Sequence, residues 1–335
     1  MKLNMKQWFS DMIAAPTKKA LPVLSFPTVQ LMDISVRELI SDSDLQAEGL
    51  VRVADRIPSA ASVSLMDLSV EAECFGSEVR VSDDEVPTIV GSVVTDEDDL
   101  AAMEIPAIGA CRTGIYIEGI RKACERISDR PVFAGMIGPY SLAGRLMDVT
   151  EIMYACYDDP DLVHGVLEKV SDFLIAYANA YKAAGANGVM MAEPLAGLLS
   201  PDLSEEFSCA YVKKIVDAVQ TDDFAVVYHN CGNAVDRMIP EILSTGCMAY
   251  HFGNATDLRG ILPQIPADVP CMGNIDPAGE FRNGTPESIR KATLDLMKDC
   301  TVYPNFVISS GCDIPPMSKW ENIDAFFKAV DEFYA

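Results

Sequence analysis

A regular alternation of strand-like and helix-like segments is the feature that most constrains the fold of this chain. Short apolar runs rich in β-branched residues recur along it, and each is followed by a longer stretch with helical periodicity. The runs expected to form strands are residues 21–27, 62–67, 131–138, 188–194, 225–231, 249–254, 270–276 and 306–312. This repeated strand–helix unit predicts a closed (β/α)₈ barrel with parallel strands inside and helices outside.

An open, doubly wound α/β sheet is the alternative arrangement for the same alternation. Such a sheet should carry a glycine-rich nucleotide-binding loop after its first strand, and neither G-x-G-x-x-G nor G-x-x-x-x-G-K-[ST] occurs in the sequence. No linker rich in Pro, Gly or Ser divides the chain. We therefore expect one barrel domain over residues 1–335, with a short N-terminal helical extension and a long excursion, residues 71–130, after the second strand.

Helix-capping signals mark two of the expected helices. Thr285 followed by Pro286 is typical of an N-cap with proline at the first helical position. Ser318 and Glu321 have the spacing of a capping box before a last helix over residues 320–334. Within the excursion, the runs 76–81 and 88–91 predict a small hairpin.

The charge balance excludes several kinds of partner. The chain has 50 acidic and 26 basic residues, a net charge of −24, so it lacks the basic surface that nucleic acid or an anionic membrane requires. No apolar stretch reaches the roughly 18 residues of a membrane span, and residues 1–9 lack the apolar core of a signal peptide. The ten cysteines show no regular short spacing. We expect a cytoplasmic protein with reduced cysteines that binds neither nucleic acid nor a membrane.

A His-x-Cys pair stands at the end of the fifth expected strand. Residues two apart in a strand project to the same side, so His229 and Cys231 should face together. Cys312 ends the eighth expected strand, and in a barrel both strand ends lie at one mouth. One imidazole and two thiolates suit zinc, and three protein ligands with an open fourth position are typical of catalytic zinc sites. The alternative on spacing alone is a core cysteine beside a buried histidine, but the shared place at strand ends favours the metal site.

Other polar residues also follow expected strands and are candidates for the same mouth. Glu193 ends the fourth strand and is a candidate zinc ligand or catalytic base, the alternative being a carboxylate bonded to loop backbone. Candidates for binding a cofactor are Asp67, His251, Asn274 and Asp276. Strand-end aspartates often cap the following helix, which is the alternative for Asp67 and Asp276. Packing of the mouth is the alternative for His251.

Several of these motifs together resemble the uroporphyrinogen decarboxylase superfamily. They are Phe133-Ala134-Gly135-Met136-Ile137-Gly138-Pro139, Glu193-Pro194, His229-x-Cys231, Gly273-Asn274-Ile275-Asp276-Pro277, and Gly311-Cys312-Asp313-Ile314-Pro315-Pro316 with Glu321-Asn322-Ile323. The resemblance extends from about residue 71 to the end. It is closer to the zinc methyltransferase branch, the methylcobamide:coenzyme M methyltransferases, which is similar in carrying His-x-Cys and a distant Cys as zinc ligands. The resemblance also implies the barrel.

This resemblance implies transfer of a methyl group from a methylated corrinoid, such as methylcobalamin, to a thiol such as coenzyme M. The bound zinc would remove the proton of the acceptor thiol, because a coordinated thiol is deprotonated at neutral pH. The chain has no D-x-H-x-x-G corrinoid motif. A separate corrinoid protein is therefore the expected methyl donor and partner.

Two alternatives from other classes stay open. One is the cofactor-independent decarboxylase of the same superfamily, whose porphyrinogen substrate carries many carboxylates and calls for arginines near the first strand. The first arginine of this chain is Arg37, beyond that strand. The other is a non-catalytic barrel that carries a corrinoid or a metal, which four protein ligands to the metal would favour.

Overall fold

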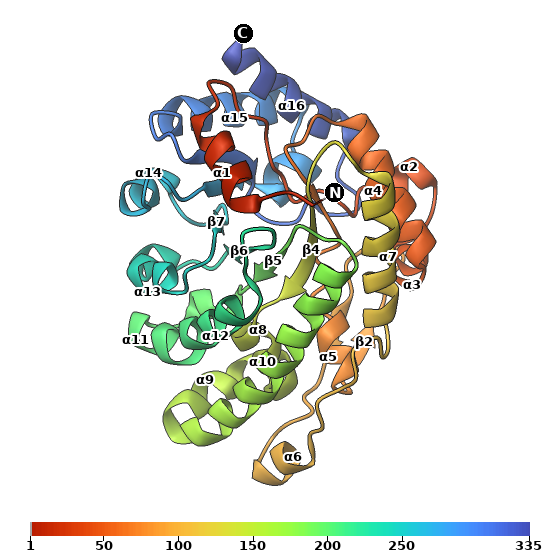
Figure 1. Ribbon diagram of the computed structural model, residues 1–335, viewed down its shortest axis with the longest axis vertical. Helices are drawn as coiled ribbons and strands as arrows, with labels where there is room; N and C mark the ends of the chain where they lie inside the picture. Colours follow the sequence, from red (N-terminus) through yellow and green to blue (C-terminus); the bar gives the residue numbers. More distant parts are fainter. Residues whose placement is uncertain (1) are drawn as a thin grey trace.

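The structure of the protein, a computed structural model, describes residues 2–335. Its centre is a curled sheet of seven parallel strands in the order β1-β4-β5-β6-β7-β8-β9, with helices around its outside (Figure 1). The strands of this sheet are β1 (Ser62–Val63), β4 (Val132–Ile137), β5 (Gly188–Ala192), β6 (Ala225–Asn230), β7 (Ala249–Phe252), β8 (Cys271–Ile275) and β9 (Phe306–Ser310). A separate antiparallel hairpin consists of β2 (Glu78–Arg80) and β3 (Thr88–Val90), as the sequence predicted.

Most of the helices alternate with the strands along the chain and cover the outer face of the sheet. They are α1 (Met5–Ala14), α2 (Thr28–Met32), α3 (Val36–Ser41), α4 (Ser43–Arg56), α5 (Val70–Cys74), α6 (Glu97–Ala102), α7 (Thr113–Arg126), α8 (Pro139–Met147), α9 (Val149–Asp158), α10 (Pro160–Ala183), α11 (Pro201–Ser204), α12 (Ala210–Val219), α13 (Ile239–Ser244), α14 (Leu258–Ile261), α15 (Pro286–Cys300) and α16 (Trp320–Tyr334). Over residues 2–335, none of these helices combines the length and the apolar character needed to cross a membrane.

The expected first strand, residues 21–27, is not a strand. The Leu21 N–H donates to the carbonyl of Ile308 in β9 at 3.0 Å, and the Ala60 N–H, just before β1, donates to the carbonyl of Ala20 at 2.8 Å. A regular ladder does not form, because Pro22 has no N–H to donate and the Val23 N–H binds a side chain, the hydroxyl of Ser310, at 3.0 Å. The segment 20–23 nevertheless hydrogen-bonds on both sides, to β9 and to the chain before β1.

The two faces of the sheet pack into different cores, because alternate residues of a strand face opposite sides. The outer face packs against the helices. The inner face forms a smaller apolar cluster to which Leu21 and Val23 also belong. Met5 and Phe9 of α1 complete this cluster, and the Met5 N–H donates to the carbonyl of Asp222, just before β6. Helix α1 therefore covers the end of the sheet where the strands begin.

The capping signals in the sequence have different outcomes. Thr285 caps α15 with Pro286 at its first position, as expected. The last helix, α16, has the expected bounds, but the capping box expected at Ser318 is wrong: Lys319 is the N-cap residue, and the Ser318 hydroxyl has no hydrogen-bond partner. Helices α2 and α3 are separate, since Asp33 adopts a left-handed conformation with φ of 56° and ends α2.

Close packing between neighbouring strands predicts an effect of mutation at Gly188. A Cβ atom there would lie 2.3 Å from the carbonyl oxygen of Ala225 and 2.7 Å from the ring of Phe133. We expect Gly188→Ala to lower the free energy of unfolding by roughly 1–3 kcal/mol, the usual cost of overpacking, measured by urea denaturation.

The matched control is Gly260→Ala in α14, where an added Cβ meets no atom within 4 Å. Alanine favours a helix over glycine, so this change should leave stability unchanged or raise it by up to about 1 kcal/mol. Equal losses in the two variants would contradict the packing that the structure shows around Gly188.

Candidate metal centre

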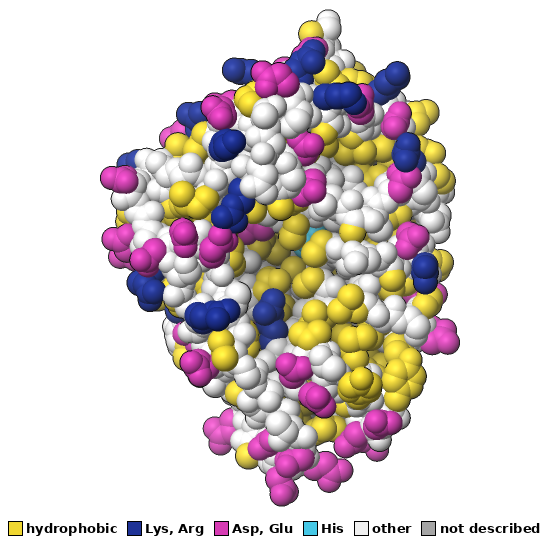
Figure 2. Space-filling view, turned by 180° about the vertical axis from the view of Figure 1, so that it is seen from behind, with side chains coloured by type: hydrophobic (Ala, Val, Ile, Leu, Met, Phe, Trp, Pro, Cys, Tyr) yellow, Lys and Arg dark blue, Asp and Glu magenta, His cyan; other side chains and the backbone are white. Residues whose placement is uncertain are grey.

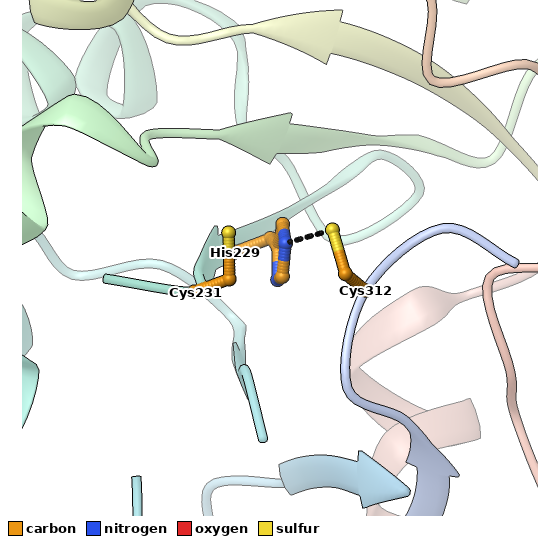
Figure 3. Close-up of side chains that lie close together, drawn as sticks. All are labelled: His229, Cys231 and Cys312. Atoms are coloured by element: carbon orange, nitrogen blue, oxygen red, sulfur yellow. Dashed lines mark hydrogen bonds between the residues drawn. The ribbon is translucent and has the colours of Figure 1, made fainter. Parts of the chain in front are cut away.

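The three side chains of the expected zinc site lie together at the carboxyl end of the sheet. His229 belongs to β6, Cys231 follows that strand directly, and Cys312 lies in the loop after β9. One ligand atom of each, the imidazole nitrogen or the sulfur, lies within 4.8 Å of the other two. His229 Nε2 is 3.3 Å from Cys312 Sγ, and the two sulfur atoms lie on either side of the imidazole ring (Figure 3).

Strand alternation explains why these side chains face inward. Ala225 and Val227 of β6 belong to the inner apolar cluster, and His229 continues the same row. The end of β7 leaves room for the neighbouring Cys231 because residue 253 is glycine. A Cβ at Gly253 would lie 2.5 Å from both Cα and Cβ of Cys231, and 3.2 Å from the carbonyl oxygen of Gly311, which precedes the third ligand.

The donor set and its spacing fit a zinc ion. In a tetrahedral site with Zn–S of about 2.3 Å and Zn–N of about 2.0 Å, neighbouring ligand atoms lie roughly 3.6–3.8 Å apart. Here His229 Nε2 and Cys312 Sγ are 3.3 Å apart, and all three ligand atoms lie within 4.8 Å of one another. Among His, Cys, Asp and Glu side chains of residues 2–335, this is the group close enough to share an ion, and no carboxylate belongs to it. The protein therefore offers three donors and leaves a fourth position open.

The two cysteines of the centre differ in pKa before any metal binds. A hydrogen bond between them lowers the pKa of Cys231, and the same contact together with burial raises the pKa of Cys312 well above its ordinary value. Such a pair readily holds one thiolate near neutral pH, and thiolates are the form that binds metals.

A second histidine lies directly behind the first. His251 of β7 pairs in register with His229 of β6, so the two rings face the same side, and their Nδ1 atoms are 2.7 Å apart. His251 Nε2 is 2.8 Å from the hydroxyl of Ser309, which in turn donates to the carbonyl of Leu21 at 2.7 Å. His251 and Ser309 are both fully buried, and burial lowers the pKa of His251 well below its ordinary value, so this imidazole is neutral.

Glu193, the expected base or ligand, does not join the three donors. Inward positions of β5 are Met190 and Ala192, so Glu193 faces the helices instead. Its carboxylate is fully buried and accepts long hydrogen bonds from Ser208 at 3.2 Å and from Ser141 at 3.4 and 3.5 Å. Burial raises the pKa of Glu193 to about 8.

The remaining expected residues form hydrogen bonds with the segments that surround the mouth. Asp67 accepts hydrogen bonds from Arg112 at 2.5 Å and from the hydroxyl of Tyr116 at 2.7 Å. Asn274 donates to the carbonyls of residues 253 and 256, in the loop after β7, at 2.9 and 2.8 Å. Asp276 caps the helical turn Pro277–Arg282 by accepting from two backbone N–H groups.

Sequence reasoning missed two residues that shape this centre. Ser309 was visible only as part of an apolar run, although a polar residue two positions after Val307 on the inner face of a strand is a usable signal. Gly253 carries no such signal, because its role depends on how closely β7 approaches the segment after β6.

On the surface, the face shown in Figure 2 has a central hollow lined largely by hydrophobic side chains, with a histidine visible at its bottom.

Solved structures share this fold. A methyltransferase from Methanosarcina mazei superposes with a TM-score of 0.87 at 24% identity, covering 100% of both chains. A B12-independent methionine synthase from Shewanella sp. superposes with a TM-score of 0.65 at 12% identity, covering 95% of this chain and 96% of the other.

Sequence relatives include proteins of two kinds. A methylcobamide:CoM methyltransferase of Methanosarcina acetivorans is 27% identical over 272 residues, which is 80% of this chain and 78% of the relative. A uroporphyrinogen decarboxylase of Coxiella burnetii is 26% identical over 299 residues, 87% of this chain and 82% of the relative. The family model for uroporphyrinogen decarboxylase matches residues 23–333. The chain therefore belongs to the uroporphyrinogen decarboxylase (URO-D) family.

Proposed function

We propose that this protein is a zinc-dependent methyltransferase that moves a methyl group from a methylated corrinoid to a small thiol such as coenzyme M. The observation that carries the proposal is the convergence of His229, Cys231 and Cys312, with ligand atoms within 4.8 Å of one another. The methylcobamide:CoM methyltransferases among its relatives support the same activity. The corrinoid is expected on a separate protein.

The charges of the three donors suit this chemistry. With His229 neutral and both cysteines as thiolates, the donors carry two negative charges and balance a divalent ion. When bound, zinc would hold the acceptor thiol as a thiolate at neutral pH. Transfer to that thiolate would form an S–C bond, and the Co–C bond of the methylated corrinoid would break with its electron pair left on cobalt. Two thiolate ligands donate strongly and make the ion a weak acid toward water, so we expect negligible hydrolase activity.

The two alternatives differ from this proposal in what the site would have to offer. A porphyrinogen decarboxylase needs arginines free to bind substrate carboxylates. Arg112, which lies next to the mouth residue Asp67, is instead bound by Asp67 and Glu73 at 2.5 and 2.7 Å. A metal carrier would be expected to supply four protein ligands, whereas here three converge. Uroporphyrinogen decarboxylases among the relatives make the first alternative the one to test.

We also propose that residues 20–24 take the place of an eighth strand and close the sheet into a barrel, so that residues 1–335 form one barrel domain. The hydrogen bonds from Leu21 to β9 and from Ala60 to Ala20 support closure. We keep as a proposal that the protein is cytoplasmic and binds neither nucleic acid nor a membrane. The net charge of −24 supports the absence of these two kinds of partner.

The first prediction from this proposal concerns zinc and methyl transfer. We expect about one zinc per chain in the purified protein, and loss of that zinc in Cys231→Ser and Cys312→Ala. The zinc-loaded protein should remove the methyl group of methylcobalamin when a thiol is present, followed by the loss of the methyl–cobalt absorbance. Both variants should lose this activity.

A protein that takes up no zinc would overturn the metal site. A protein that binds zinc, leaves methylcobalamin unchanged with every thiol tried and decarboxylates a porphyrinogen would identify the decarboxylase instead.

The second prediction uses Gly253, which lies against both ligand-bearing segments. Gly253→Ala leaves every zinc donor in place but forces Cys231 or Gly311 to move, because a Cβ would lie 2.5 Å from backbone of the former. We expect zinc affinity, measured by competition with a chelator, to fall by at least 10-fold. The control is again Gly260→Ala, which should bind zinc as the wild type does. Unchanged affinity in Gly253→Ala would show that the ligand positions tolerate this displacement.

The third prediction concerns the buried carboxyl of Glu193. Its pKa is about 8 in the folded protein, against an ordinary value of 4.5. Between these two pH values the unfolded chain releases a proton that the folded protein keeps, so rising pH favours unfolding over this window. Glu193→Gln should therefore lose less stability between pH 5 and pH 8 than the wild type, as measured by thermal melting at each pH.

The same variant tests the role of Glu193 in transfer. We propose that the buried carboxyl acts on transfer indirectly, by fixing the segment whose Glu193 N–H donates to the His229 carbonyl at 2.8 Å, so Glu193→Gln should keep its zinc but transfer the methyl group more slowly. The matched control is Glu71→Gln, since burial also raises the pKa of Glu71, to about 7, while its carboxylate binds the Ile137 N–H. The control should share the change in pH dependence but not the slower transfer. Equal transfer rates in all three proteins would assign Glu193 to stability alone.

A further inference from the structure

We propose that the backbone carbonyl of Leu21 determines, through Ser309 and His251, which nitrogen of His229 carries its proton. His251 is then a positioning residue: it keeps the Nε2 lone pair of His229 free and aimed at the two cysteines. The inference deepens the proposed function and rests on it for the identity of the metal, but the assignment of the protons concerns this chain alone.

Four groups form one continuous row of hydrogen bonds. The separations are 2.7 Å from His229 Nδ1 to His251 Nδ1, 2.8 Å from His251 Nε2 to Ser309 Oγ, and 2.7 Å from Ser309 Oγ to the Leu21 oxygen. His229 is 2% exposed, and His251 and Ser309 are 0% exposed, so water does not compete for these bonds.

The direction of every bond follows from the last one. A carbonyl oxygen only accepts hydrogen bonds, so the single hydroxyl proton of Ser309 must point to Leu21. The Ser309 oxygen then accepts from His251 Nε2, which must carry a proton. A neutral imidazole has one N–H, so His251 Nδ1 is an acceptor and His229 Nδ1 must be the donor. Applied to the neutral form of His229, the same rule leaves Nε2 without a proton.

The reverse arrangement leaves two groups without satisfactory partners. If His251 Nδ1 donated to His229, then His251 Nε2 would need the hydroxyl proton of Ser309. The oxygen atoms of Ser309 and Leu21 would then face each other at 2.7 Å with no proton between them, inside the protein. A buried acceptor without a donor costs roughly 1–3 kcal/mol, and the reversed ring of His229 would in addition point an N–H at the metal position.

The consequence is a ligand that is oriented before the metal arrives. His229 Nε2 lies 3.3 Å from Cys312 Sγ with its lone pair on that side. Histidines that bind metals generally donate their other ring N–H to a fixed acceptor, which sets tautomer and ring orientation. Here the acceptor is a second histidine, whose own proton is held by Ser309.

The direct test reads the protons by nitrogen NMR. The chain has three histidines, so ¹⁵N-histidine labelling in a His164→Gln background leaves only the two rings of the row. His164 is a suitable background position because it binds Tyr211 and Glu206, apart from this centre. In the zinc-free protein at pH 8, we expect His229 as the Nδ1–H tautomer and His251 as the Nε2–H tautomer.

Variants then test the influence of each group on metal binding. Ser309→Ala removes the hydroxyl, and we expect mixed tautomers and a zinc affinity lower by about 10- to 100-fold, measured by chelator competition. Ser310→Ala is the matched control: its hydroxyl binds the Val23 N–H of the same N-terminal segment but no histidine side chain, so zinc affinity and tautomers should not change.

Two replacements of His251 separate the effect of its hydrogen bonds from the effect of its side-chain volume. A glutamine amide both accepts and donates, so His251→Gln should keep most of the zinc affinity, whereas His251→Phe fills the space without accepting and should lose about 10- to 100-fold. The inference is wrong if the wild type shows His229 as the Nε2–H tautomer, or if the phenylalanine and glutamine variants bind zinc equally well. Failure of the proposed function looks different: zinc binding or methyl transfer would be missing while the two tautomers are as assigned.

Discussion

The in-register pairing of β6 with β7 is the constraint on which the candidate centre depends. It sets His229 opposite His251 on the inner face of the sheet, and Cys231, directly after β6, lies on the same side. A slip of one residue would turn each of these side chains toward the helices. The apolar residues that precede them in the same rows, Val227 and Ala249, resist such a slip because they would leave the inner core. Packing of the apolar residues that precede the site in these strands therefore maintains the geometry of the site residues.

The inner face changes from apolar to polar within a few residues, and this transition is stable because each polar group has a neighbour to bind. His251 lies between His229 and Ser309, and Ser309 lies between His251 and the main chain at Leu21. Asn274, on the next strand, binds two carbonyls of the loop that contains Gly253. Leaving any one of these groups unpaired would cost about 1–3 kcal/mol, so the loop and the row of hydrogen bonds support one another.

Much of this arrangement was accessible from the sequence, and the exceptions have physical causes. The period of the apolar runs located the strands of the large sheet, and the spacing of His229 and Cys231 placed both on one face. The run that begins at Leu21 failed as a strand because Pro22 and a side-chain acceptor interrupt its backbone ladder. Glu193 was correctly placed at a strand end. The sequence position alone did not reveal which alternate residues of β5 face inward, and Glu193 belongs to the set that faces the helices. Contacts such as that of Gly253 depend on the distance between segments, which no local pattern encodes.

The acceptor at the end of the hydrogen-bonded row belongs to the main chain, and this affects how the site tolerates mutation. Any residue at position 21 presents the same carbonyl, so exchange of the side chain there leaves the polarity of the row intact. What the site does not tolerate is a change in chain length just before β1 or just before Leu21, because that would move the carbonyl away from Ser309. The evolutionary constraint on this end of the centre is thus one of length and path, and it would be invisible in the identity of the residue itself.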